Sequence, residues 1–350
     1  MAFSLSKLSA SVDAMILLSS SAAKRDYSTT WLSGVELYDF SCVVVRTRGM
    51  FLLAKPHELS VVQQGRIKDV RALKDNLYGY LAAHVKAKNI GINMRVVSVR
   101  EMKLLKKAFP NARFVDVSDD VMRLREIKTK EEIALIRKAC SIGDEILGLC
   151  VKKMKRFSSE TDVAAFLLNE IAKRGCEPSF KPIVASGKNA GIIHHSPAPA
   201  PLRKGFLIID FGVRYRNYCS DMTRTFYLGT PSERERALYQ RLLAVQEATI
   251  GVVKPGAVGK DVDAFSRERL GDLAPLMTHG LGHQIGIETH EGSRNLNSRG
   301  EFLLREGMAV TVEPGVYREG RWGLRIEDTC VVGAKGAKVL TKFPKQLISI

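Results

Sequence analysis

The first third of the chain alternates short apolar runs with longer stretches of mixed polarity. Such runs of four to eight residues predict buried strands, here at Ala14–Ser19, Cys42–Arg46, Met50–Ala54, Arg95–Val99 and Arg113–Val117. The mixed stretches predict helices near Val70–Lys88 and Glu101–Phe109. Thr47-Arg48-Gly49 is a turn between two of the strands. This order predicts an α/β domain over residues 1–124.

The remaining residues, 125–350, show one order of elements twice. A capping box at Thr129 and Glu132 begins a helix with a single apolar stripe, and a second helix starts near Thr161. Strand-like stretches follow at Ser179–Ser186, Phe206–Val213 and Tyr218–Leu228. The second round has helices from Ser232 to about Gly251 and from Lys260 to Leu270, then strands around Met277–His283, Met308–Tyr317 and Leu324–Val332. Two helices followed by three strands, twice, predict an α+β domain with an internal duplication.

The composition is that of a soluble globular protein, with 45% hydrophobic and 26% charged residues. No apolar run approaches the length of a membrane span, and Asp13 interrupts an N-terminal stretch that otherwise resembles a signal peptide. The six cysteines are scattered without paired spacing, which favours free thiols in a reducing compartment. We therefore expect a cytoplasmic protein without a membrane partner.

The net charge of +17 permits binding to an acidic partner. The basic residues are dispersed, however, and no basic motif is interleaved with aromatic residues as in nucleic-acid-binding segments. The pattern favours a solvated basic surface over a nucleic-acid interface.

The densest chemistry lies in His279–Glu291, which holds three of the seven histidines and three glycines. His279 and His283 have the spacing of a helical zinc motif, but Gly280 stands where that motif needs Glu, and the glycines oppose a helix. The stretch predicts a metal or acid–base site outside a helix.

Two pairs of acidic residues, far from these histidines in sequence, predict the other half of the site. A two-residue turn at Tyr215-Arg216 would place Asp210 directly opposite Asp221 on neighbouring strands. A hairpin that turns at Gly320 would place Glu313 opposite Glu327. Like charges that face each other are destabilising unless a cation lies between them.

Each half of the duplication thus supplies one acidic pair. Four carboxylates and one histidine suit two hard or borderline divalent ions such as Mn²⁺, Co²⁺ or Zn²⁺, held by bridging carboxylates. His194 and His195 form a further cluster, and only one of two adjacent side chains is expected to enter the site.

The motifs FKPIVASGKNAGIIHH, IIDFGxxYxxYxSDxTRTF, HGLGHQIGIETHE, VTVEPGVY and GLRIEDT, in this order, resemble the pita-bread metallopeptidases. The resemblance covers about Leu124 to Leu340 and points to the proline-specific branch, which contains prolidase (Xaa-Pro dipeptidase) and aminopeptidase P. The N-terminal domain more weakly resembles the creatinase-like domain of that branch. The resemblance therefore implies a creatinase-like α/β domain followed by a pita-bread catalytic domain.

The same resemblance implies a role for each matching residue. The metal ligands would be Asp210, Asp221, His283, Glu313 and Glu327. The catalytic groups would be His194, His290 and Glu313, with Glu313 as general base to a hydroxide that bridges the two metals. The substrate contacts would be His279, Tyr317, Arg325 and Phe180, and Arg325 could hold a carboxylate of the substrate.

Three positions depart from the usual pattern of the family. Gln284 replaces a glycine, Ile193 often corresponds to Pro in prolidases, and Phe180 stands where aminopeptidase P tends to have Tyr. These departures leave open whether dipeptides or longer peptides are preferred.

The function implied by the resemblance is hydrolysis of the Xaa-Pro bond in dipeptides or short peptides, and the family implies a homodimer. Aminopeptidase P activity on longer peptides is the alternative. A non-catalytic binding module and a creatinase-like hydrolase that acts without metal also fit the fold, but such proteins typically lose metal ligands and this chain keeps all five.

Overall fold

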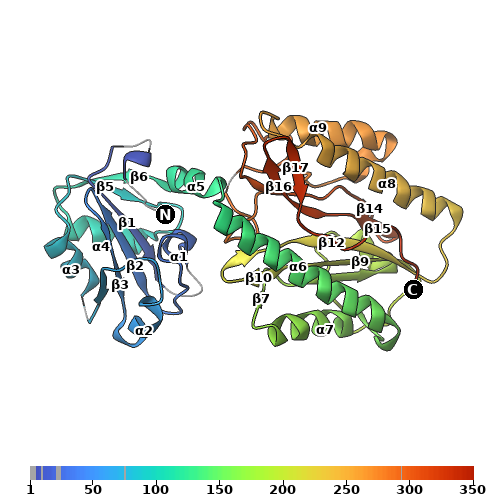
Figure 1. Ribbon diagram of the computed structural model, residues 1–350, viewed down its shortest axis with the longest axis horizontal. Helices are drawn as coiled ribbons and strands as arrows, with labels where there is room; N and C mark the ends of the chain where they lie inside the picture. Colours follow the sequence, from blue (N-terminus) through green and yellow to red (C-terminus); the bar gives the residue numbers. More distant parts are fainter. Residues whose placement is uncertain (1–4, 9–10, 21–24, 75, 293) are drawn as a thin grey trace. The chain divides into compact units, whose positions relative to one another are not determined.

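The structure is a computed structural model that describes residues 5–8, 11–20, 25–74, 76–292 and 294–350. The chain divides into two compact units, Met1–Arg125 and Glu126–Ile350 (Figure 1). We refer to them as the N-terminal unit and the C-terminal unit, and we describe each by itself.

The N-terminal unit is built on a six-stranded mixed sheet with the order β4-β3-β2-β1-β5-β6. The β1–β2 and β2–β3 pairs are antiparallel, whereas the β3–β4, β1–β5 and β5–β6 pairs are parallel. Its strands are β1 (Ala14–Ser19), β2 (Ser41–Arg46), β3 (Met50–Ala54), β4 (Val70–Ala72), β5 (Asn89–Ile92) and β6 (Arg113–Asp116). Its α-helices are α1 (Tyr27–Ser33), α2 (Leu59–Val62), α3 (Leu77–His84), α4 (Val99–Ala108) and α5 (Ser118–Glu126).

Some predictions for this unit are confirmed and others are wrong. The strands at Ala14–Ser19 and Met50–Ala54 match β1 and β3. The strand predicted at Arg95–Val99 is absent, because Ser98 caps α4 through a capping box with Glu101 and the chain turns into that helix. The helix predicted over Val70–Lys88 is also wrong in its first part, since residues 70–72 pair with β3 as a strand. Pairing within the sheet overrides local preference there.

The C-terminal unit repeats two helices followed by antiparallel strands. The first round contains α6 (Lys130–Lys153), α7 (Glu160–Lys173), β7 (Glu177–Pro178), β8 (Ile183–Ser186), β9 (Gly205–Phe211), β10 (Val213–Tyr215), β11 (Tyr218–Cys219) and β12 (Met222–Leu228). The second contains α8 (Glu233–Val252), α9 (Gly259–Leu270), β13 (Ala309–Val312), β14 (Gly315–Arg318), β15 (Trp322–Arg325), β16 (Asp328–Gly333) and β17 (Gly336–Val339). The predicted capping box at Thr129/Glu132 is present, and the helix predicted from Ser232 also begins with a capping box, formed by Ser232 and Glu235.

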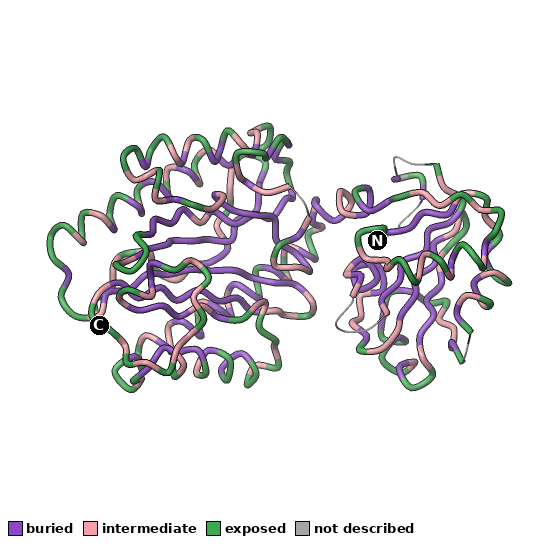
Figure 2. Tube along the Cα trace, turned by 180° about the vertical axis from the view of Figure 1, so that it is seen from behind, coloured by how far each residue is buried: buried purple, intermediate pink, exposed green. Residues whose placement is uncertain are grey.

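Each helix pair covers its own group of strands and its own hydrophobic core. Ile146 of α6 and Leu167 of α7 pack with Ile209 of β9, whereas Leu242 of α8 packs with Val310 of β13. In Figure 1 the strands of this unit lie between α7 on one side and α8 and α9 on the other. Figure 2 shows that the central strands are almost continuously buried, while the helices are exposed on their outer faces. The buried strands of this unit thus form its interior, and the helices form its outer surface.

The first strand predicted for the second half, around Met277–His283, is irregular. Residues 277–283 form no regular strand, yet residues 281–285 run beside β13 through three backbone hydrogen bonds: Ile285 N to Ala309 O, Thr311 N to His283 O and Glu313 N to Leu281 O. In the first half, β8 pairs with β9 in the corresponding place. The pattern of the duplication is therefore kept, with glycine-rich backbone in place of one strand.

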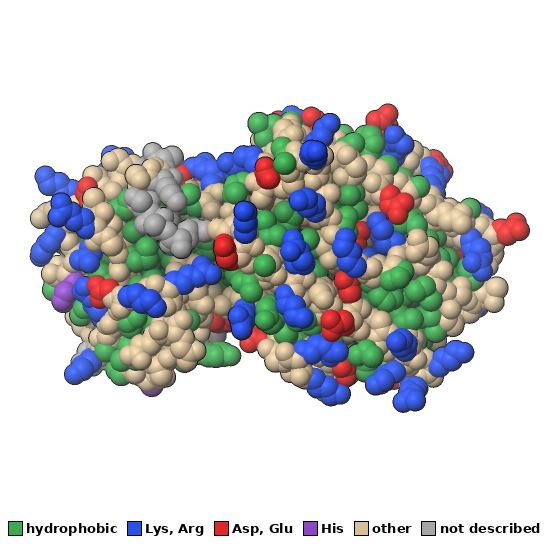
Figure 3. Space-filling model, viewed as in Figure 1, with side chains coloured by type: hydrophobic (Ala, Val, Ile, Leu, Met, Phe, Trp, Pro, Cys, Tyr) green, Lys and Arg blue, Asp and Glu red, His purple; other side chains and the backbone are tan. Residues whose placement is uncertain are grey.

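The surface and the thiols agree with the sequence analysis. On the face in Figure 3, Lys and Arg side chains are spread over each unit and interspersed with Asp and Glu. All six cysteines are free. Among the helices of the described ranges, none combines the length and the apolar character that crossing a bilayer would need.

Candidate metal centre

The first acidic pair lies where the hairpin of β9 and β12 passes from one sheet to another. The predicted turn at Tyr215-Arg216 is wrong by one residue: Arg216 and Asn217 form the turn, with φ of 46° and 71°. Asn adopts such left-handed backbone readily, as a type I′ turn requires. Asp210 consequently pairs with Thr223, two residues beyond Asp221. A displacement of two residues keeps the face, so Asp210 and Asp221 still point to the same side.

The second acidic pair has the predicted register. Gly315 pairs with Arg325, and Val312 pairs with Asp328, so one register runs through both ladders of this hairpin. Glu313 and Glu327 lie between the two ladders, and the common register places them opposite each other across the hairpin. Gly320, at the predicted turn, has a φ of 69°.

The histidine segment brings His283 between these hairpins. The glycine before it is required, because a Cβ at Gly282 would lie 2.1 Å from the Thr311 carbonyl oxygen. This close approach lets His283 N donate to Thr311 Oγ1 at 3.0 Å, and it fixes the ring over the carboxylates. The His283 Nε2 atom lies 3.5 Å from Asp221 Oδ2 and 3.6 Å from Glu313 Oε1.

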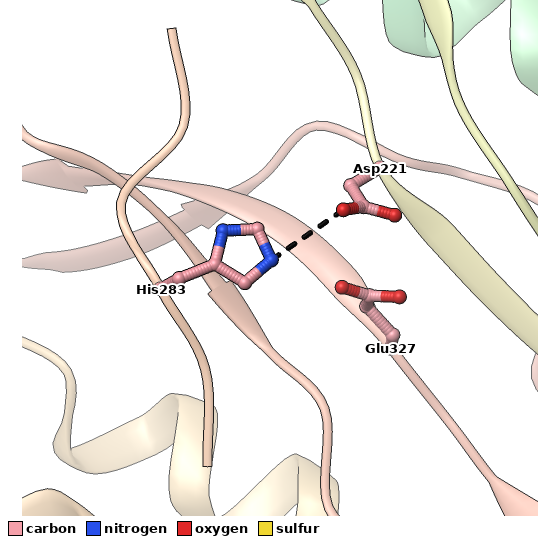
Figure 4. A group of neighbouring side chains, drawn as sticks. All are labelled: Asp221, His283 and Glu327. Carbon is pink, nitrogen blue, oxygen red and sulfur yellow. Dashed lines mark ion pairs between the residues drawn. The ribbon is translucent and has the colours of Figure 1, made fainter. Parts of the chain in front are cut away.

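Asp221, His283 and Glu327 point toward one another from three segments of the chain (Figure 4). One ligand atom from each lies within 4.8 Å of the others. They line a cavity of about 460 Å³ together with Asp210 and Glu313. The structure thus brings all five residues to one place.

Burial of so many acids together perturbs their ionisation. Burial raises the pKa of Asp210 to about 6, although the Arg325 charge opposes this, and burial raises the pKa of Glu313 to about 7. Burial and the charge of Asp221 raise the pKa of Glu327 well above its ordinary value. Burial alone would lower the pKa of His283, but the hydrogen bond to Asp221 and the charge of Glu313 raise it to about 9.

These residues fit a divalent cation. Within the described residues, Oδ1 of Asp210 and Oδ1 of Asp221 are buried and accept no hydrogen bond. His283 Nδ1 lies 3.1 Å from the Gln284 carbonyl, to which it can donate, and this leaves Nε2 as the atom that faces the carboxylates. A ligating histidine almost always donates its other N–H in this way. Oxygen donors with one imidazole suit Mn²⁺, Co²⁺ or Zn²⁺.

Gln284, which replaces the usual glycine, contacts His283 through its backbone. Only its backbone carbonyl faces His283, so the type of side chain matters little to the ring. The side chain is buried, and its Nε2 donates to the Arg294 carbonyl at 3.1 Å.

A chain of hydrogen bonds extends from the acids to the cavity wall. Arg325 donates to Asp210 Oδ2 at 2.6 Å, to Tyr317 Oη at 2.6 Å and to Thr223 Oγ1 at 3.0 Å. The Tyr317 hydroxyl lies 3.1 Å from His279 Nε2, and His279 Nδ1 lies 2.7 Å from the Gly280 carbonyl. Burial and the Arg325 charge lower the pKa of His279 to about 4, so this ring is neutral. His279 and Arg325 line the cavity, whereas Tyr317 lies behind them.

The other predicted residues also meet the cavity. His194, Phe180 and His290 line it, and the His290 ring packs edge-on against the His283 ring with centroids 4.2 Å apart. His195 turns away from the cavity and contacts Glu160. One of the two adjacent histidines therefore enters the site.

Several residues of the site escaped the sequence analysis. Asn295 and Asn297 line the cavity from a loop that carries no motif. Thr223 donates to Glu327 Oε2 at 2.7 Å. Thr223 lies in the motif SDMTRTF and pairs with Asp210. The sequence could have indicated this pairing, but the turn was predicted one residue too early.

Comparison with known proteins shows the family of the chain. Residues 134–334 match the model of metallopeptidase family M24, and residues 8–127 match the creatinase/prolidase N-terminal domain. The chain belongs to metallopeptidase family M24 and is a peptidase. The predicted combination of a creatinase-like domain and a pita-bread catalytic domain is confirmed.

Individual relatives resemble the chain over most of its length. An Xaa-Pro dipeptidase of Pyrococcus furiosus is 37% identical over 67% of this chain and 68% of its own. The crystal structure of an X-Pro aminopeptidase from Thermotoga maritima superposes with a TM-score of 0.91 and 29% identity, over 97% of this chain and 98% of its own. The crystal structure of a prolidase from Pyrococcus horikoshii superposes with a TM-score of 0.88 and 28% identity, over 96% of each chain.

Proposed function

We propose that the chain hydrolyses the Xaa-Pro bond of dipeptides or short peptides with two divalent metal ions. The ligands would be Asp210, Asp221, His283, Glu313 and Glu327. The observation that carries this proposal is the set of four carboxylates that line one cavity with His283, whose Nε2 lies 3.5 Å from Asp221 and 3.6 Å from Glu313, while two buried carboxylate oxygens of the set accept no hydrogen bond within the described residues. The similarity to an Xaa-Pro dipeptidase and a prolidase supports the substrate class.

When bound, two such ions would supply Lewis acidity, which activates water and polarises a carbonyl near neutral pH. Glu313 is the proton acceptor in this proposal. Its side chain is 18% exposed, against 6% for Asp221, so it is the more accessible of the two carboxylates beside His283. A base must reach the proton that it removes, and Glu313 meets the cavity directly.

The two remaining histidines of the cavity are placed to act on the substrate. His194 is exposed at the cavity wall and would donate to the oxygen on which negative charge develops. His290 lies beside His283 and would assist the departing amine. Both assignments rest on position, with support from the family resemblance.

Arg325 receives a different role from the one expected. Each of its three nitrogens donates to a protein acceptor: Asp210, Tyr317 or Thr223. We therefore assign Arg325 to holding Asp210 and Tyr317, rather than to capture of a substrate carboxylate.

Selectivity for proline must come from the shape of the pocket. The Xaa-Pro bond has no N–H to bind, because the proline nitrogen is fully substituted. Phe180 and His279 line the cavity, and we propose that they shape the space for the ring.

The test compares Ala-Pro with Ala-Pro-Gly-Gly as substrates of the Mn²⁺-loaded protein, with Ala-Ala as control. Hydrolysis of Ala-Pro with little cleavage of the tetrapeptide is the expected result and defines a dipeptidase. Preference for the tetrapeptide would instead define an aminopeptidase P activity, in line with the similarity to an X-Pro aminopeptidase. Cleavage of Ala-Ala at the same rate would refute specificity for proline.

A further inference from the structure

Glu160, in the first turn of α7, is a buried carboxylate outside the metal centre. Its residue is 0% exposed, and it accepts five hydrogen bonds from one segment of the chain. The donors are Ser186 N at 2.7 Å, Ser186 Oγ at 2.9 Å, Asn189 Nδ2 at 3.0 Å, His195 Nε2 at 2.7 Å and Ala198 N at 3.1 Å. Burial would raise the pKa of Glu160, but the donors from Ser186, Asn189 and His195 hold it below its ordinary value.

These donors belong to the last residue of β8 and to the segment that joins β8 to β9. Ser186 is the last residue of β8, and Ala198 lies twelve residues further along the chain. One carboxylate therefore binds both ends of this stretch. Thr161 N also donates to Ala198 O at 3.3 Å, which adds a backbone contact from α7. Residues 187–198 are thereby fixed to α7.

This segment presents His194 to the cavity. The His194 side chain is exposed, and its ring makes no hydrogen bond within the described residues. Its position therefore depends on the backbone that carries it. The next residue, His195, turns the opposite way and donates to Glu160.

We propose that Glu160 is a positioning residue for the hydrolytic reaction, which acts through His195 and the 187–198 segment to place His194 at the substrate. This inference rests on the proposed function. Glu160 touches neither the substrate cavity nor the five candidate ligands. Its effect must therefore pass through His194.

The chemistry of the carboxylate makes the proposal specific. An ionised carboxylate only accepts hydrogen bonds, which suits five donors. A glutamine at this position would place an amide NH₂ against donors that point at it, whichever way the amide turns. A displacement of about 1 Å at a reacting group can cost about 100-fold in rate.

The main variant is Glu160→Gln, and Glu170→Gln is its matched control. Glu170 lies on the same helix and pairs with Lys173 and Arg174, away from the cavity. Both are assayed on Ala-Pro with Mn²⁺, alone and combined with His194→Ala. Mn²⁺ binding and thermal unfolding are measured on the same preparations.

For Glu160→Gln we expect kcat to fall about 10- to 100-fold. KM and the Mn²⁺ dissociation constant should stay within about twofold, since an interaction used only in the transition state is lost. In the His194→Ala background the same change should have no further effect, because residues that act through one group are not additive. Glu170→Gln should behave as the wild type. The proposal would be overturned if Glu160→Gln lowered kcat in the His194→Ala background as much as it does in the wild type. It would also be overturned if Mn²⁺ binding weakened by the same factor as kcat.

Replacement of His195 separates positioning from general stability. His195→Gln keeps an N–H donor for Glu160 and should retain more of the wild-type kcat than His195→Leu. Equal kcat values for these two variants would contradict the proposed path.

Amide hydrogen exchange tests whether Glu160 holds residues 187–198, and it does not depend on enzymatic activity. We expect faster exchange across residues 187–198 in Glu160→Gln and wild-type exchange there in Glu170→Gln. Unchanged exchange in Glu160→Gln would overturn the inference even if the protein is active. If the wild type is inactive but exchange is faster in Glu160→Gln, the proposed function is refuted. The role of Glu160 in holding residues 187–198 is then still supported.

Discussion

The hydroxyl of Thr223 connects the two acidic hairpins, and its removal is the most informative perturbation of the metal centre. Thr223 Oγ1 donates to Glu327 Oε2 at 2.7 Å and accepts from Arg325 Nε at 3.0 Å. Val has nearly the same shape and lacks the hydroxyl. The variant Thr223→Val therefore leaves the Glu327 carboxylate without this donor while the packing is kept.

The expected size of the effect follows from the charge of Glu327. A hydrogen bond to a charged group contributes about 1.5–3 kcal/mol. Because about 1.4 kcal/mol changes a dissociation constant tenfold, Mn²⁺ should bind about 10- to 100-fold more weakly. Loss of a group that supports a metal ligand typically has this magnitude.

The assay is calorimetric titration of the metal-stripped protein with Mn²⁺, with Thr225→Val as the control. Thr225 lies two residues further along β12 and is also buried, but among the described residues its hydroxyl forms hydrogen bonds with the backbone of Arg325 rather than with a carboxylate. We expect wild-type affinity for the control. Wild-type affinity in Thr223→Val, or equal weakening in both variants, would refute the reasoning.

Other predictions concern stability. Lys128→Met removes the ammonium 2.8 Å from buried Glu291 and should lower the free energy of unfolding by about 3–5 kcal/mol in urea; a loss below about 1 kcal/mol would contradict this. Mn²⁺ at about 100 times its dissociation constant should raise the free energy of unfolding by about 2.7 kcal/mol, and a chelator should reverse the change in thermal unfolding. The backbone N–H groups of Asn89 and Lys88 hold the pKa of Asp13 below its ordinary value, so its stabilising contribution is present above pH ~4 and lost as the pH falls through the lowered pKa. The stability difference between wild type and Asp13→Asn should therefore shrink from pH 7 to pH 3, and a constant difference would contradict the assignment.

The sequence predicted the strands and helices whose signals are local. The capping boxes at Thr129 and Ser232 depend on residues three positions apart, and both helices start there. The turn at Gly320 set the register of Glu313 and Glu327 correctly, because glycine marks the left-handed position. Where the signal was weaker, at Tyr215-Arg216, the turn was misplaced by one residue.

What the sequence could not predict depends on contacts between distant segments. Residues 70–72 form a strand because β3 is available to pair with them, and no local pattern encodes that. Glu160 belongs to no motif of the sequence, and only the fold brings it to His195. Arg325 looked like a binder of carboxylates until its acceptors inside the protein were known.

The most direct test of the central claim follows hydrolysis of Ala-Pro while the metal-stripped protein is titrated with Mn²⁺. Bound metal is measured in the same samples, and Asp221→Asn is titrated in parallel. The account predicts that activity rises as up to two ions bind per chain, and that the variant binds less metal and stays nearly inactive. Absence of Ala-Pro hydrolysis by the wild type with Mn²⁺, Co²⁺ and Zn²⁺ alike would contradict it.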